Sequence, residues 1–203
     1  MQELDVKKIL RLDLNFNEKS INKLSLFSEE LIKANQSHNF IAKSTEKDMW
    51  SRHILDSAQL VKYIDFKNKS LADFGSGGGF PGIVLAIFNQ NKDFHVKLFE
   101  KSPVKRKFLE SVIQKLDINA VVYSNIYDNK IDADVVVSRA FKKLEKLIQV
   151  SREIVKKPHK LIVLKGQNAQ EELNKAFKRQ KYSYKLEKSM TEKESKIIII
   201  DLI

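Results

Sequence analysis

From Ser70 onward, short apolar runs alternate with segments of helical periodicity, and this alternation restricts the fold more than any other feature of the chain. The runs that predict strands are 70–74, 94–100, 119–124, 133–138, 160–165, 182–189 and 196–203. Helices fit between them over 81–90, 103–116, 141–156 and 168–180, with a short irregular link near 126–131. Such alternation indicates an open, mostly parallel α/β sheet covered on both faces. The last two runs are joined only by a short turn and are therefore predicted to be antiparallel neighbours.

The first third of the chain has the pattern of helices instead. Apolar residues recur near a 3.6-residue period in 17–35 and again in 45–64, and the spacing of Thr45 and Asp48 predicts a capping box at the start of the second helix. His53 lies on the apolar stripe of that helix. We interpret it as a hydrogen-bonded core histidine, with a role in ordering the N-terminal segment against a ligand loop as the alternative. We expect an N-terminal helical extension over 1–66 and a domain over 67–203 that form one compact unit.

Composition excludes several classes of site. The chain has no cysteine, which excludes disulfides, thiolate metal sites and cysteine nucleophiles, and its four histidines lie far apart in sequence, so we expect no metal. No apolar run is long enough to span a bilayer, and we expect a cytoplasmic protein. The net charge is +11, and residues 1–66 hold as many acidic as basic residues. The excess in the rest of the chain fits either a polyanion-binding surface or lysine used for solubility.

Five of the six glycines lie within 75–82, where the first predicted strand of the alternating region meets its first helix. Glycines at such a turn allow positive φ and a close approach by a ligand, while the amides at the helix start favour electronegative groups. Gly77, Gly79 and Gly82 satisfy the pattern G-x-G-x-x-G, and Glu100 ends the next strand, where an acceptor for ribose hydroxyls is expected. The pattern fits a nicotinamide enzyme and a nucleoside-binding methyltransferase.

Asp73 separates these two alternatives. It lies two residues before Gly75, where its carboxylate would repel a pyrophosphate but could meet a cationic or amine-bearing ligand. The antiparallel pair of terminal strands is also typical of methyltransferases. We therefore favour S-adenosylmethionine as the cofactor, and an NAD(P)-dependent oxidoreductase stays open as the alternative.

Five motifs extend this interpretation to a family. They are "RHILDS" (52–57), "DFGSGGGFPGIVLAI" (73–87), "KRKFL" (105–109), "VVSRAF" (136–141) and "LKG" (164–166). In this order they resemble the bacterial glucose-inhibited division protein B family, the small-subunit (16S) ribosomal RNA guanine-N7 methyltransferases. The resemblance implies a class I S-adenosylmethionine-dependent methyltransferase domain and 16S ribosomal RNA, within the small ribosomal subunit, as the partner. Nothing in the sequence demands more than a monomer.

The resemblance also implies roles for the residues at matching positions. Many relatives carry an acid at the position of Tyr127, so this tyrosine departs from the family pattern. Arg139 would lie beside the methionine portion of the cofactor and the target base. The implied cofactor contacts are Gly75 and Phe80, with Gly77 and Gly79 shaping the turn, Glu100 accepting the ribose hydroxyls, and Ile126 and Tyr127 holding the adenine.

The segment from Ser138 to Phe141 lacks the polar residue, two prolines and aromatic residue that enzymes methylating exocyclic amines usually carry, and carbon-5 methylation of pyrimidines needs a cysteine. Guanine N7 has a free lone pair, so its methylation needs no general base, and we interpret Arg139 as a positioning residue.

Basic residues flank the predicted carboxyl edge of the sheet. If they share that edge, they form a phosphate-binding rim around the cofactor pocket, although charge scattered for solubility is the alternative. The residues expected to bind RNA are Lys101, Lys105, Arg106, Lys142, Lys143 and Lys165. A protein that binds RNA through a methyltransferase fold without turnover is a third alternative.

Overall fold

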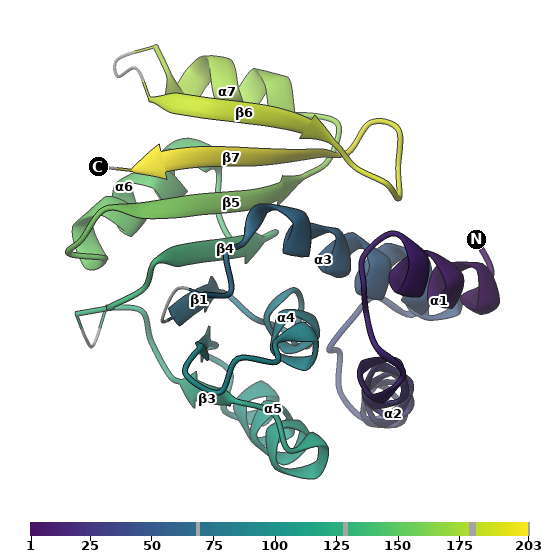
Figure 1. The fold of residues 1–203 in the computed structure, drawn as a ribbon. Helices are drawn as coiled ribbons and strands as arrows, with labels where there is room; N and C mark the ends of the chain where they lie inside the picture. The colour runs from purple at the N-terminus through teal and green to yellow at the C-terminus, as the bar shows by residue number, and fades with distance from the viewer. Residues whose placement is uncertain (68–69, 128–129, 179–181, 203) are drawn as a thin grey trace.

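The computed structural model describes residues 1–67, 70–127, 130–178 and 182–202. At its centre lies one seven-stranded sheet with the order β3-β2-β1-β4-β5-β7-β6 (Figure 1). The strands are β1 (Ser70–Phe74), β2 (His95–Phe99), β3 (Ala120–Tyr123), β4 (Val135–Arg139), β5 (His159–Lys165), β6 (Ser183–Lys188) and β7 (Lys196–Leu202). The first five strands are parallel, and β7 runs antiparallel to β5 and β6. The predicted α/β class with an antiparallel terminal strand is confirmed.

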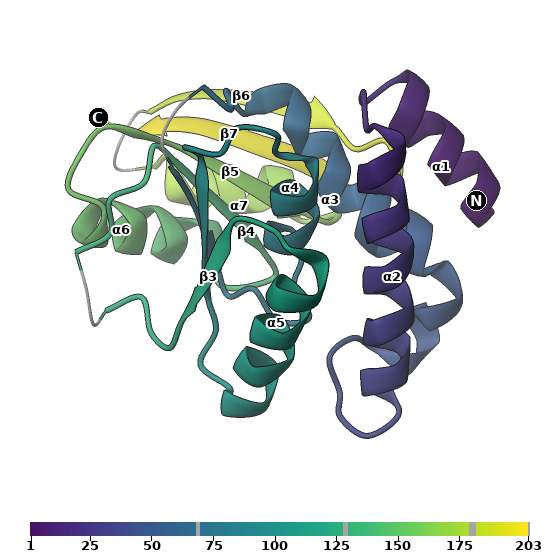
Figure 2. The ribbon, with the colours of Figure 1, turned by 60° about the horizontal axis from the view of Figure 1, so that its bottom comes forward.

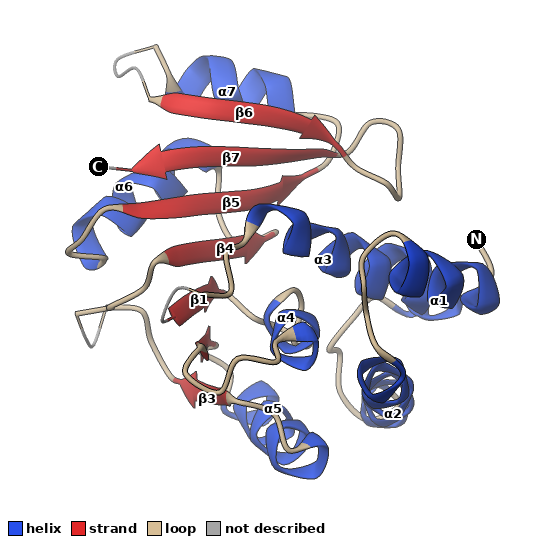
Figure 3. Ribbon diagram, viewed as in Figure 1, coloured by secondary structure: helices blue, strands red, loops and turns tan. Residues whose placement is uncertain are grey.

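Helices follow β1, β2, β4 and β5, and the described residues between β3 and β4 form no helix, as the alternation predicts (Figure 3). They are α4 (Gly82–Phe88), α5 (Pro103–Leu116), α6 (Leu144–Ile154) and α7 (Ala169–Ala176). Residues 128–129 of the predicted link, 179–180 of the last predicted helix and 203 of the last predicted strand lie outside the described residues.

Two hydrophobic clusters cover the two faces of the sheet. On one face, α4 and α5 pack with the N-terminal segment, and on the other face lie α6 and α7 (Figure 2). Neighbouring strand residues alternate between the clusters, so that Leu71 belongs to the first and Ala72 to the second. Because both faces are covered, all five residues of β1 are buried, including Asp73. This explains why the strands read as continuous apolar runs.

The N-terminal segment is helical but less regular than predicted. Its elements are α1 (Glu3–Leu12), α2 (Glu18–Asn35), the 3-10 helix η1 (Lys43–Asp48), the π-helix η2 (Met49–Leu55), α3 (Asp56–Ala58) and the 3-10 helix η3 (Gln59–Tyr63). The predicted capping box is wrong, because the hydroxyl of Thr45 donates to the carbonyl of Ala42 at 2.8 Å and contacts His53 Nε2 at 2.9 Å. Within the described residues, no helix has the length and apolar character needed to cross a membrane.

Candidate active site

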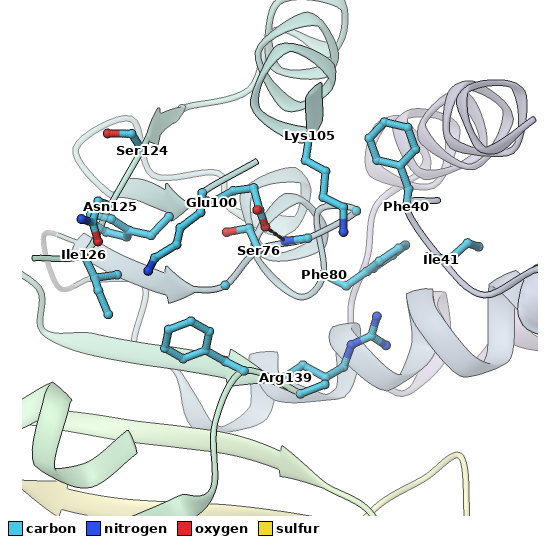
Figure 4. Close-up of a pocket in the computed structure, with 17 residues that line it drawn as sticks. Phe40, Ile41, Ser76, Phe80, Glu100, Lys105, Ser124, Asn125, Ile126 and Arg139 are labelled. Carbon is cyan, nitrogen blue, oxygen red and sulfur yellow. Dashed lines mark hydrogen bonds between the residues drawn. The ribbon is translucent and has the colours of Figure 1, made fainter. Parts of the chain in front are cut away.

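The strand order reverses beside β1, because the chain adds β2 and β3 on one side and then returns to place β4 on the other. Ligands of open α/β sheets bind at such a point, outside the carboxyl ends of the strands. A cavity of about 370 Å³ opens there, lined by the glycine loop, by Glu100 after β2, by residues after β3 and by Arg139 at the end of β4 (Figure 4). The predicted elements therefore converge on one cavity.

Gly75 and Gly79 combine positive φ with positions where a side chain would not fit. Gly75 has φ 79°, and a Cβ there would lie 2.5 Å from Cδ2 of Phe141. Gly79 has φ 102°, and its Cβ would lie 2.8 Å from Cγ1 of Ile83. The backbone can therefore pass close beneath the cavity and still turn into α4.

Glu100 presents a fixed carboxylate to the cavity. Its Oε2 accepts a hydrogen bond from the amide of Gly77 at 2.9 Å, and its Oε1 accepts one from the amide of Ser102 at 2.8 Å. The side chain of Ser102 in turn caps α5 at Lys105. Each carboxylate oxygen keeps further acceptor capacity, so the group can receive hydroxyl donors from a ligand without first being reoriented.

Apolar side chains from several parts of the chain line the cavity. The side chain of Ile126 is buried and lines the cavity, together with Phe141 and Phe80. Ser124 and Asn125 also line it, and sequence reasoning missed both although they directly follow the third strand. Tyr127 is 50% exposed and is not among the described lining residues, and its expected role beside Ile126 stays a prediction.

Phe40 and Ile41 bring the N-terminal extension into the wall. They lie between the two predicted helices 17–35 and 45–64, in a segment to which the sequence analysis assigned no role. A Cβ at Gly78 would lie 3.3 Å from the carbonyl oxygen of Phe40, so this segment packs directly on the glycine loop. The adjacent apolar residues Phe40 and Ile41, in an otherwise mostly polar segment, could have indicated this contact.

Asp73 does not line the cavity, which corrects its expected contact with the ligand. It is fully buried, and its Oδ2 accepts the amide of Gly82 at 3.0 Å, while its Oδ1 has no hydrogen-bond partner among the described residues. Burial raises the pKa of this carboxyl to about 7, against the opposing effects of the Gly82 amide and Arg139. Asp73 therefore holds the start of α4 in place.

Arg139 lies at the edge of the cavity and is held mainly by the extension. Its Nη1 donates to the carbonyl of Arg52 at 3.1 Å and lies 3.6 Å from Oδ2 of Asp56. Its Nη2 donates to Nδ1 of His53 at 2.9 Å. The guanidinium carbon lies 5.0 Å from the centre of the Phe80 ring, within range of a cation–π interaction.

The predicted basic rim is only partly available to a ligand. Lys101 and Lys105 line the cavity, and Lys143 is exposed. Arg106 donates to the carbonyls of Glu100 and Lys101, which fixes its guanidinium at the start of α5.

Lys142 and Lys165 have structural contacts of their own. The ammonium of Lys142 lies 4.9 Å from the centre of the Phe141 ring. Lys165 is a correction, because its ammonium is nearly buried, pairs with Glu172 at 2.8 Å and donates to the carbonyl of Lys142 at 2.7 Å. Its charge is neutralised inside the fold.

The sequence model of the family described as rRNA small subunit methyltransferase G matches residues 20–199. The chain belongs to this family. Proteins named ribosomal RNA small subunit methyltransferase G are similar over nearly their whole length. The protein of Orientia tsutsugamushi (strain Ikeda) is 34% identical over 95% of this chain and 96% of its own. That of Rickettsia felis is 37% identical over 88% and 91%, and that of Pelagibacter ubique 32% identical over 100% and 98%.

Solved structures show the same fold at low identity. An S-adenosylmethionine-dependent methyltransferase from Aquifex aeolicus has a TM-score of 0.61 and 12% identity, over 87% of this chain and 98% of that one. TYW2 of M. jannaschii, solved with AdoMet, has a TM-score of 0.54 and 20% identity, over 75% and 76%. Membership in the methyltransferase G family confirms the predicted resemblance, enzyme class and S-adenosylmethionine cofactor, and does not favour the oxidoreductase.

Proposed function

We propose that this enzyme methylates N7 of a guanine in small-subunit (16S) ribosomal RNA. The observation that supports the proposal best is the cavity at the strand reversal, where the fixed carboxylate of Glu100 and the guanidinium of Arg139 line one space. The proposal includes a cytoplasmic monomer that acts on the small ribosomal subunit.

The described residues fit S-adenosylmethionine. Glu100 would accept the ribose hydroxyls, Ile126 and Asn125 would enclose the adenine, and the loop from Gly75 to Gly79 would pass beneath the ligand. When bound, this cofactor supplies an electrophilic methyl group on a sulfonium. The chain's own contribution is then to orient both reactants and to exclude water.

The lining residues favour a target that needs no deprotonation. Among the described lining residues, the one acidic side chain is Glu100, whose two oxygens already accept backbone amides, and no histidine is present. Guanine N7 can be methylated without a general base, because its lone pair is free. Arg139 would orient the target or the methionine portion through its donors, and it holds no proton for transfer.

Contact with RNA phosphates is assigned to the basic side chains that remain available. Lys101 and Lys105 line the cavity, and Lys143 is exposed before α6. Neutralising phosphates at this edge would hold an unstacked guanine over the cavity, because N7 is hidden in the deep groove of a regular RNA helix.

Labelled S-adenosylmethionine, incubated with unmodified small ribosomal subunits and separately with naked 16S RNA, tests the proposal. We expect one labelled 7-methylguanine after nuclease digestion, and strong loss of incorporation for Glu100→Ala and Arg139→Ala. Label in protein, or on another atom of the RNA, would contradict it. So would thermal stabilisation of the enzyme by NAD alone.

A further inference from the structure

The motif "RHILDS" lies in the N-terminal extension, and the proposed function does not yet use it. Residues 52–55 of the motif end the π-helix η2, a rare form that is frequently found at functional sites, and Asp56 and Ser57 follow in α3. Three acceptors from this short stretch surround the guanidinium of Arg139: the carbonyl of Arg52, Nδ1 of His53 and the carboxylate of Asp56. A regular helix was predicted over these residues. The structure instead has an irregular turn, and it lies where these residues contact Arg139.

The direction of each hydrogen bond in this group follows from the chemistry of the side chains. A guanidinium can only donate, so Nδ1 of His53 must accept from Arg139 and the imidazole must be neutral. The ring proton then lies on Nε2, which donates to the hydroxyl of Thr45 at 2.9 Å. Thr45 in turn donates to the carbonyl of Ala42 at 2.8 Å. One tautomer of His53 satisfies the whole chain of bonds.

The surroundings of His53 maintain this neutral state. Burial, followed by the charges of Arg139 and Arg52, lowers the pKa of the imidazole to about 3. The ring also lies 5.1 Å from the Phe80 ring, centre to centre. The guanidinium of Arg139 lies over that same phenylalanine, which lines the cavity. The imidazole of His53 and the guanidinium of Arg139 thus both lie against the ring of Phe80.

We infer that His53 is a positioning residue of the active site: its neutral Nδ1 fixes the guanidinium of Arg139 at the edge of the cavity. This inference rests on the proposed role of Arg139. It makes the N-terminal extension part of the active site, because Thr45, His53 and Asp56 all belong to that extension. A histidine that only filled the hydrophobic core would not need to accept a hydrogen bond from a residue that lines the cavity.

Two substitutions separate positioning from packing. His53→Asn keeps an acceptor near the place of Nδ1, whereas His53→Leu fills similar space without one. We expect His53→Leu to lower kcat by about 10²-fold, the cost of a misplaced reactive group, and to change KM less. His53→Asn should recover most of the rate. In an Arg139→Ala background, His53→Leu should cause no further loss. His95→Leu, at an exposed histidine on the amino end of β2, is the control and should keep full activity.

Nitrogen-15 NMR of the imidazole tests the inference without turnover. In the wild-type enzyme, the His53 proton should lie on Nε2, and the ring should stay neutral down to about pH 4. In Arg139→Ala it should titrate at higher pH, because one positive neighbour is gone, while the His95 signal stays unchanged. A proton on Nδ1, an unchanged titration in Arg139→Ala, or equal losses in the Asn and Leu variants would overturn the inference. If no RNA methylation is detected, the proposed function is wrong. The NMR result then tests the role of His53 by itself.

Discussion

Asp73 and Glu100 show how burial separates two acids near the carboxyl ends of neighbouring strands. Both were expected to contact the cofactor, Asp73 because it lies two residues before Gly75 and Glu100 because it ends the strand that follows the glycine pattern. Glu100 lies one residue beyond β2 and meets the cavity, whereas Asp73 lies within β1 and is covered on both faces of the sheet. Relative to the strand ends the two acids differ by two positions, so Asp73 is enclosed within the sheet while Glu100 lies beyond it, and the sequence does not fix where each strand ends.

The buried carboxyl of Asp73 makes stability depend on pH. Its pKa is about 7 in the folded chain, against an ordinary value of 3.8, so the folded state keeps a proton that the unfolded state releases. Stability from this group is therefore full below about pH 4 and is lost as the pH rises to about 7, by at most roughly 4 kcal/mol. Asp73→Asn should remove the effect. We expect the melting temperature of the variant, relative to wild type, to rise between pH 5 and pH 8. A difference that stays constant over this range would refute the assignment.

At the scale of elements, the sequence predicts regular structure well and irregular structure poorly. The bounds of β1 and α5 agree with those expected, because continuous apolar burial and a local cap at Ser102 determine them. The turns from η1 to η3 were expected as one helix. Their form depends on long-range bonds, such as those between Arg139 and the π-helix η2, that no local pattern records.

Lys165 joins β5, α7 and the start of α6. Its ammonium links the end of β5 to Glu172 of α7 and to the carbonyl of Lys142, and the same Glu172 oxygen accepts the amide of Leu144 at 2.7 Å. Lys165→Met would leave a partly buried carboxylate without its cation. We expect the free energy of unfolding in urea to fall by about 1–3 kcal/mol. The salt dependence of RNA binding should not change.

Lys143→Ala is the matched control for this prediction. Lys143 is exposed, so its removal should leave unfolding unchanged and weaken RNA binding, with a salt-dependence slope smaller by about one. If Lys165→Met also reduced the slope, Lys165 would belong to the RNA-binding surface after all.

At the scale of the whole molecule, the extension and the domain share one hydrophobic cluster. Leu24, Phe27 and Leu31 of α2 are fully buried in the same cluster as Ile83 of α4 and Leu109 of α5. The Phe27 ring lies 5.3 Å from the ring of Phe80, which lines the cavity. The boundary at residue 66 stays a prediction. The hydrophobic core contains residues from both sides of it.

Residues 67–203 alone should not reach a well-ordered fold. Removing the extension would expose the apolar surface of α4 and α5, and each large side chain returned to water costs roughly 1.5–3 kcal/mol. We expect the truncated chain to aggregate or to bind hydrophobic dyes, with poorly dispersed amide NMR signals. A well-dispersed spectrum matching that of the full chain would contradict this.

The position of β7 has a consequence for synthesis of the chain. β7 follows β6 in sequence, yet it lies between β5 and β6 in the sheet. While the ribosome is still translating residues 196–202, β5 has an open edge and β6 has no neighbour. Unpaired strand edges recruit other chains, so a nascent polypeptide stalled before β7 is at risk of aggregation. Slow codons shortly before β7 should therefore lower the yield of folded protein more than slow codons placed earlier.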